Sequence, residues 1–86
     1  MLIHLGGDVV IQNKDVVAIL DYSKRSLDKS IAAFLDHYEQ QGKVVWITEN
    51  VSKSIIITDH LVYVSPISSF TLNRRRLSED QERGEH

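Results

Sequence analysis

The sequence has 86 residues, a formal net charge of −2 at neutral pH and no cysteine. This length fits one small domain, and the lack of cysteine excludes disulfides, thiolate zinc sites and iron–sulfur clusters. The apolar runs "VVAIL" and "KVVWI" are too short to span a bilayer, and "MLIHLGGD" does not have the pattern of a secretory signal. We therefore expect a small soluble protein of the cytoplasm that does not associate with membranes.

The N-terminal third predicts three strands. The segments "LIHL" and "VVIQ" are separated by "GGD", whose glycines suit a tight turn. The turn signal "NKD" then leads into "VVAILDY", which is rich in β-branched residues. We expect these three strands to pair in chain order as a meander.

One long amphipathic helix is predicted next. Its apolar residues recur at helical spacing and form a single stripe, which consists of Leu27, Ile31, Phe34, Leu35 and Tyr38. Ser23 or Ser26 is expected to cap its start, and Gly42 is expected to end it.

The second half predicts three more strands and a short helix. The strands are "KVVWIT", "SIIIT" and "LVYVS", and "DH" joins the last two as a hairpin. Pro66 ends the last strand, and Ser68 or Ser69 can cap a helix that runs to about Leu77. The prediction is an α+β domain over residues 1–77 with a small, mostly antiparallel sheet. Residues 78–86, "SEDQERGEH", carry four acids and no apolar side chain, so we expect a disordered acidic tail.

The strands are apolar at successive positions, so both faces of the sheet need cover. A single long helix covers one face, and either another copy of the chain or the C-terminal helix covers the other. We expect a homo-oligomer, with Trp46 buried in the protomer core or at the subunit interface.

Catalytic and metal-binding patterns are weak. His4 could approach His60 near Asp59 or Asp8, but no His pair has metal-ligand spacing in the sequence. The "LGGD" segment is not a phosphate-binding loop, and no nucleophile motif occurs. We expect no enzyme activity, metal or cofactor.

The basic residues allow two interpretations. Lys14 and Lys53 fall in loops, where a long cation can reach a phosphate, but loop lysines are also ordinary surface charge. Lys24, Arg25 and Lys29 gather near the start of the long helix. Arg74–Arg76 end the last helix, where arginines complement the helix dipole. Three successive side chains spread over about 200° of helix surface, so they cannot all serve one contact.

Four segments occur together in a characteristic order: "IHLGGD", "KDVV", "KSIIIT" and "YVSPISSFTLNRR". In this order they resemble the RemA/RemB family of bacterial extracellular-matrix regulators, most closely the RemB branch. The resemblance covers roughly residues 1–77.

The resemblance implies an oligomeric transcriptional regulator of biofilm-matrix genes, with a fold like LytTR domains and rings that double-stranded DNA can wrap around. Lys14 occupies the family's basic turn position, but Asn50 and Val51 stand where RemA proteins carry two arginines. The candidates for contact with DNA are Lys14, Lys53, Arg74, Arg75 and Arg76. The alternative is an oligomeric protein-interaction scaffold that does not bind DNA.

Overall fold

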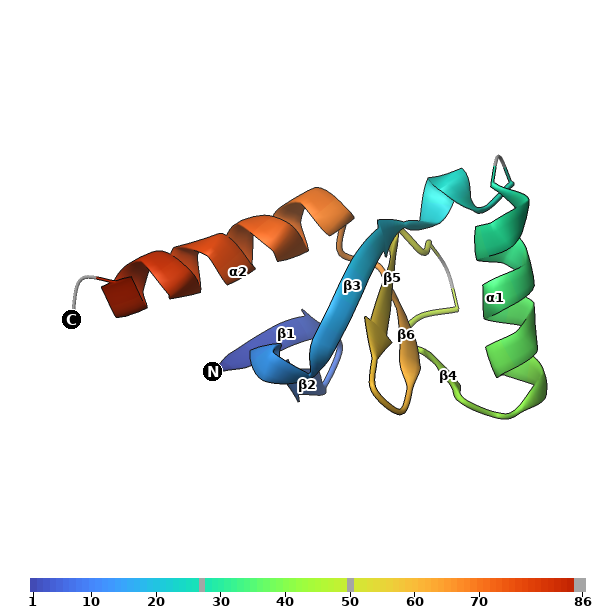
Figure 1. The fold of residues 1–86 in the computed structure, drawn as a ribbon, viewed down its shortest axis with the longest axis horizontal. Helices are drawn as coiled ribbons and strands as arrows, with labels where there is room; N and C mark the ends of the chain where they lie inside the picture. Colours follow the sequence, from blue (N-terminus) through green and yellow to red (C-terminus); the bar gives the residue numbers. More distant parts are fainter. Residues whose placement is uncertain (27, 50, 85–86) are drawn as a thin grey trace.

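The computed structural model describes residues 1–26, 28–49 and 51–84 and has the expected α+β architecture (Figure 1). Within these residues the chain forms a short hairpin, a four-stranded sheet and two α-helices, and α1 lies between β3 and β4 in the sequence. The elements are β1 (Leu2–Gly6), β2 (Val9–Gln12), the 3₁₀ turn η1 (Asn13–Asp15), β3 (Val16–Asp21), the 3₁₀ turn η2 (Tyr22–Ser26), α1 (Lys29–Gln40), β4 (Val44–Trp46), β5 (Ser54–Thr58), β6 (Val62–Ser65) and α2 (Ser69–Gly84).

The main sheet has the strand order β3-β5-β6-β4, and β1 and β2 pair separately. β5 is antiparallel to both β3 and β6, whereas β4 runs parallel to β6. The predicted N-terminal meander is therefore wrong at its third strand: β3 pairs with β5, so that Asp21 lies opposite Ser54. The physical reason is that β3 carries apolar side chains on both faces, so it is placed in a sheet covered on both sides.

Helix α1 covers one face of the sheet. Its buried Leu35 packs in a cluster with Ile55, Val62 and Val64, from β5 and β6. Part of the predicted apolar stripe also packs against this cluster, which confirms the amphipathic helix; Leu27 lies outside the described residues. Gly42 follows the helix with a φ of +69°, as a residue that ends a helix requires.

The β1–β2 hairpin and the first turns of α2 cover the other face. Ile3 and Leu5 of β1 pack with Ile56 of β5 and Leu72 of α2. The buried hydroxyl of Ser65 donates a hydrogen bond to the backbone oxygen of Leu5, which fixes the hairpin to β6. Both faces are thus covered within one chain, and the doubly apolar strands do not themselves require a second copy.

The turn between β1 and β2 depends on glycine. Gly6 and Gly7 have φ values of +114° and +54°, which confirms the predicted glycine turn. A Cβ atom on Gly6 would also lie 3.1 Å from Cγ of Pro66. Glycine at residue 6 therefore lets the hairpin pack closely against the end of β6.

The start of α1 differs from the sequence prediction. The carboxylate of Asp28 accepts a hydrogen bond from the Ser30 backbone N–H at 2.9 Å and caps the helix. Ser23, one of the two predicted caps, instead donates to Asp21. The reason is that residues 22–26 first form η2, which places Asp28 rather than either predicted serine at the helix entrance.

Helix α2 is longer than predicted. The Ser68 hydroxyl accepts from the Thr71 backbone N–H at 3.1 Å, so the proposed cap at Ser68 is confirmed. The helix continues past Leu77 to Gly84, so the backbone of residues 78–84 is helical where a disordered tail was expected. Glutamate, glutamine and arginine favour helix intrinsically, which explains how a polar segment can extend it. In Figure 1, this part of α2 projects away from the sheet.

Candidate nucleic-acid interface

Two of the candidate arginines fasten α2 to the β1–β2 hairpin. Nη1 of Arg75 donates to the backbone oxygen of His4 at 3.0 Å. Nε of Arg76 donates to Oδ1 of Asn13 at 2.8 Å, and this arginine is half-buried. Both arginines therefore have a structural role, because they join segments that are far apart in the sequence.

The expected role of the arginines at the helix C-terminus is wrong. Because α2 continues to Gly84, Arg74–Arg76 lie in the middle of the helix, away from its last carbonyl groups. The helix dipole acts within the terminal turn, so it contributes little at these positions.

Lys14 lies next to the place where Arg76 contacts the hairpin. It belongs to η1, its side chain is exposed, and the neighbouring Asn13 accepts the hydrogen bond from Arg76. We call Lys14, Arg75 and Arg76 the hairpin cations. Each guanidinium has five N–H donors, so the one hydrogen bond to the hairpin does not exhaust the capacity of Arg75 or Arg76 to bind a phosphate.

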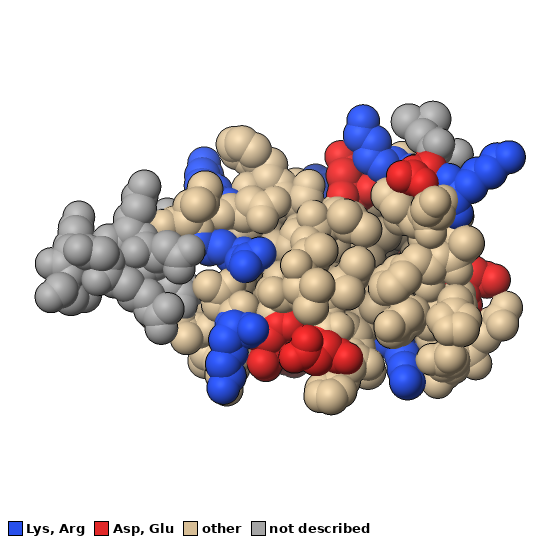
Figure 2. All heavy atoms as spheres, in the orientation of Figure 1, with Lys and Arg blue, Asp and Glu red and all other residues tan. Residues whose placement is uncertain are grey.

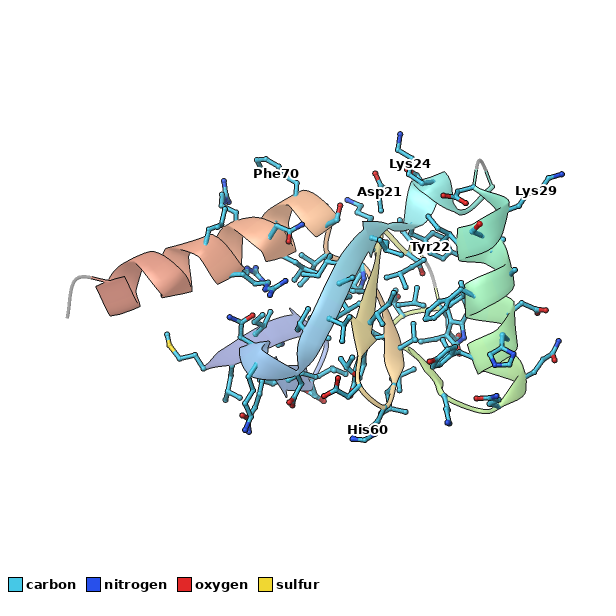
Figure 3. All side chains as sticks on the ribbon, viewed as in Figure 1. Asp21, Tyr22, Lys24, Lys29, His60 and Phe70 are labelled. Atoms are coloured by element: carbon cyan, nitrogen blue, oxygen red, sulfur yellow. The ribbon has the colours of Figure 1, made fainter. Side chains whose placement is uncertain are left out.

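Arg74 points to a different side of α2. Its guanidinium carbon lies 5.8 Å from the centre of the Phe70 ring, one turn earlier in the helix. Phe70 stands at the upper margin of α2 in Figure 3, away from the hairpin. The three adjacent arginines therefore diverge, as helix geometry predicted, and do not form one contact.

Lys53 lies at the opposite end of β3 from Lys14. Its backbone oxygen accepts from the Tyr22 backbone N–H at 3.0 Å, and its own N–H donates to the Ser65 backbone oxygen at 2.8 Å. Its side chain is exposed. The six residues of β3 separate this point from η1, which corresponds to about 20 Å at 3.3 Å per residue. Lys14 and Lys53 thus cannot contact the same phosphate.

Pairing of β3 with β5 brings Lys53 close to η2, which contains Lys24. Lys24 is exposed and stands at the upper margin of the molecule, with Lys29 nearby at the start of α1 (Figure 3). Lys24 and Lys29 lie close together in the sequence, but the sequence alone predicted no role for either. The hydrogen bond between Tyr22 and Lys53 places Lys24 beside the candidate loop, and this proximity depends on strand pairing that no local pattern shows.

An acidic residue lies within this second group. Hydrogen bonds from the side chain and backbone of Ser23 lower the pKa of Asp21 below its usual value, and the charge of Lys24 adds to the effect. Asp21 therefore keeps its negative charge at neutral pH. Figure 2 shows basic and acidic side chains side by side at this margin, so the positive potential there is local.

The loop before β5 does not present the arginine pair of RemA proteins. Val51 is an exposed apolar residue, and Asn50 lies outside the described residues. The exposed Lys53 follows directly before β5.

The histidines are not gathered into a metal centre in the described ranges 1–26, 28–49 and 51–84: no group of three or more His, Cys, Asp or Glu residues there could hold a metal ion. Nε2 of His4 lies 2.8 Å from the backbone oxygen of Gly7 in its own turn. His60 borders a hollow of about 310 Å³ with Asp15, Asp59 and Tyr63. No helix in the described part of the chain is long and apolar enough to cross a membrane.

Comparison with known proteins identifies the family. The model of the RemA-like family, described as extracellular matrix regulatory protein A-like, matches residues 2–76. The chain belongs to the RemA-like family. Extracellular matrix regulatory protein B of Bacillus subtilis (strain 168) is 40% identical over 75 residues, which are 87% of this chain and 89% of that protein. The resemblance to the RemB branch is confirmed.

The part of this RemA-like chain that matches the family contains every candidate residue, from Lys14 to Arg76, and ends one residue before Leu77. Residues 78–86 fall outside the match. The hairpin, the four-stranded sheet and the docked turns of α2 all lie within it.

Proposed function

We propose that this RemA-like chain is a transcriptional regulator of extracellular-matrix genes that binds double-stranded DNA as a homo-oligomer in the cytoplasm, without enzyme activity or a cofactor. Family membership supports the regulatory role, as does the similarity to a protein named extracellular matrix regulatory protein B. The positions of the exposed cations support the DNA-binding part.

The observation that carries the proposal is the presence of exposed cations at both ends of β3. Lys14 and Arg75 are exposed at one end, beside the half-buried Arg76, and Lys53 with Lys24 lies at the other end. Their separation of about 20 Å corresponds to roughly six base-pair steps of duplex at 3.4 Å each. One protomer can therefore meet the DNA backbone at two points, which fixes its orientation without reading bases.

Repetition in an oligomer overcomes the weak charge of one chain. The net charge of −2 gives no general attraction to DNA. When several copies present the same cations along one duplex, binding of the first copy raises the effective concentration of the others. Each neutralised phosphate also releases counterions, so the summed contacts make affinity strongly dependent on salt.

The test is titration with duplex DNA over a series of salt concentrations. The double variant Lys14→Ala with Lys53→Ala removes a cation from each end of β3. We expect weaker binding and a smaller slope of log K against log salt, by about 0.9 for each lost phosphate contact, with unchanged oligomer mass. Lys43→Ala is the matched control, because Lys43 is also exposed but lies in the turn after α1. Binding by the double variant with the parent's affinity and slope would contradict the proposed contacts.

The second candidate function is an oligomeric scaffold that binds proteins and not DNA. The exposed Val51 favours it, since an apolar side chain stands where RemA proteins carry a basic one. An oligomer that binds no duplex DNA even at low salt would support the scaffold in place of the DNA-binding regulator.

A further inference from the structure

Helix α2 presents an uncovered apolar face on the side opposite its docked face. Phe70, Arg74 and Leu77 follow at spacings of four and three residues, so they line one side of the helix. Phe70 is 72% exposed and Leu77 is 62% exposed, whereas Leu72 on the opposite side is fully buried. We call Phe70, Arg74 and Leu77 the α2 ridge.

A second incompletely covered surface lies at the other side of the fold, where α1 meets β4. β4 is an edge strand of the sheet, and its Trp46 is 43% exposed, so the expectation that Trp46 is buried in the protomer core is wrong. The indole is nevertheless fixed: its Nε1 donates to Oε2 of Glu39 at 2.9 Å, and its ring meets Tyr22 edge-on at 6.4 Å between centroids.

A hollow of about 170 Å³ opens beside the indole. Its lining combines apolar and acidic groups, namely Ala32, Leu35, Asp36, Glu39 and Trp46. We call this surface the Trp46 hollow. An apolar cavity of about 150 Å³ is known to accept a benzene molecule, so the hollow has the right size for one phenyl ring.

We propose that the α2 ridge of one copy docks into the Trp46 hollow of the next copy. The inference rests on the homo-oligomer of the proposed function and names the surfaces that form it. The ring of Phe70 enters the hollow, and Arg74 meets the carboxylates of Asp36 and Glu39 and the face of Trp46. Aromatic and arginine side chains are both enriched at protein–protein interfaces, and the opposite charges favour this partner.

The contact joins two different surfaces, so it is heterologous. Phe70 lies on α2, whereas α1, which forms one wall of the hollow, lies at the far side of the sheet (Figure 1, Figure 3). Each copy therefore has a free ridge and a free hollow after one contact forms. Repetition of such a contact gives a closed ring when the rotation closes and a filament when it does not.

The protein has a single tryptophan, so its fluorescence reports on the Trp46 hollow alone. We expect Trp46 emission to shift to shorter wavelength as the concentration rises and the oligomer forms, in parallel with mass from analytical ultracentrifugation. Phe70→Ala removes the ridge anchor, and Ala32→Lys fills the hollow and repels Arg74. Each variant should weaken association at least about tenfold and lose the shift, while Leu2→Ala, an exposed residue on β1, should change neither.

Mixing the two variants tests the pairing directly. Phe70→Ala keeps an intact hollow, and Ala32→Lys keeps an intact ridge, so an equimolar mixture should form a dimer with one contact and stop there. Recovery of the blue-shifted emission in that mixture identifies the Trp46 hollow as the docking site. A mixture that stays monomeric, or single variants that keep the parent's mass, would overturn the inference. Circular dichroism checks that both variants are folded, and Arg74→Glu provides an independent disruption of the ridge.

The outcome is separable from that of the proposed function. If the parent is oligomeric and binds DNA but Phe70→Ala leaves both properties intact, the docking contact is wrong and the regulator stands. If the parent is monomeric at every concentration, the docking contact and the oligomeric regulator both fail. If the variants behave as expected but no form binds DNA, the contact stands and the DNA-binding function fails.

Discussion

Replacing Leu72 with alanine tests whether α2 is docked on the hairpin. Leu72 is fully buried and packs with Ile3 and Leu5 of β1 and with Ile56 of β5. Removing a buried leucine side chain beyond Cβ costs roughly 2–5 kcal/mol of the free energy of unfolding. A chain of this length has a total stability of about 4–13 kcal/mol, so the loss would remove a large share of it.

Urea unfolding followed by far-ultraviolet circular dichroism measures this loss, because the signal reports both helices. Leu2→Ala is the matched control, since it makes the same chemical change at a side chain that is 66% exposed. Its free energy of unfolding should stay within about 0.5 kcal/mol of the parent at equal protein concentration. A loss below about 1 kcal/mol for Leu72→Ala would show that α2 does not pack where the structure places it.

Three further expectations concern other parts of the chain. Gly6→Ala should lower the melting temperature, because a side chain is strained at a φ of +114° and its Cβ would lie 3.1 Å from Pro66; a melting temperature equal to the parent's would contradict that geometry. Ser23→Ala should raise the pKa of Asp21 in a carboxyl NMR titration. Because folding lowers this pKa, the associated stability is present above about 3.8 and is lost as the pH falls through the folded value; an unchanged pKa would exclude the Ser23 hydroxyl as its cause. Deletion after Leu77 should leave oligomer mass and melting temperature nearly unchanged, since residues 78–86 carry no apolar side chain to bury; a drop of more than a few degrees would show that they are docked.

Elements defined by local spacing could be predicted from the sequence. Such elements include the apolar stripe of α1, the glycine turn and the serine cap of α2. Each depends on the spacing of residues that are near one another in the sequence. The neighbour of β3 could not be predicted, because pairing with β5 is decided by which arrangement covers both faces of the sheet. For the same reason, the sequence did not predict that the β1–β2 hairpin covers one face of the sheet.

The candidate site could be predicted in residue type but not in arrangement. The exposure of Lys14 and Lys53 follows from their loop positions. Arg76 contacts Asn13, which lies beside Lys14 and 63 positions earlier in the chain. This contact depends on how α2 crosses the hairpin. Through the same crossing, Arg75 and Arg76 hold α2 against the hairpin. The sequence had predicted a structural role for them at the end of the helix, which instead lies at Gly84.

The strand order also sets when this chain can fold during synthesis. β3 and β4 precede β5 and β6 in the sequence, yet β3 pairs with β5 and β4 pairs with β6. The β1–β2 hairpin forms locally, but an isolated hairpin is at best marginally stable, and its anchor at Leu5 needs Ser65. At about 5–20 residues per second, synthesis of the first sixty-five residues takes several seconds. Apolar β3 and β4 therefore stay unpartnered until the β5–β6 hairpin emerges, and that interval is when a nascent chain is most exposed to aggregation and most dependent on chaperones.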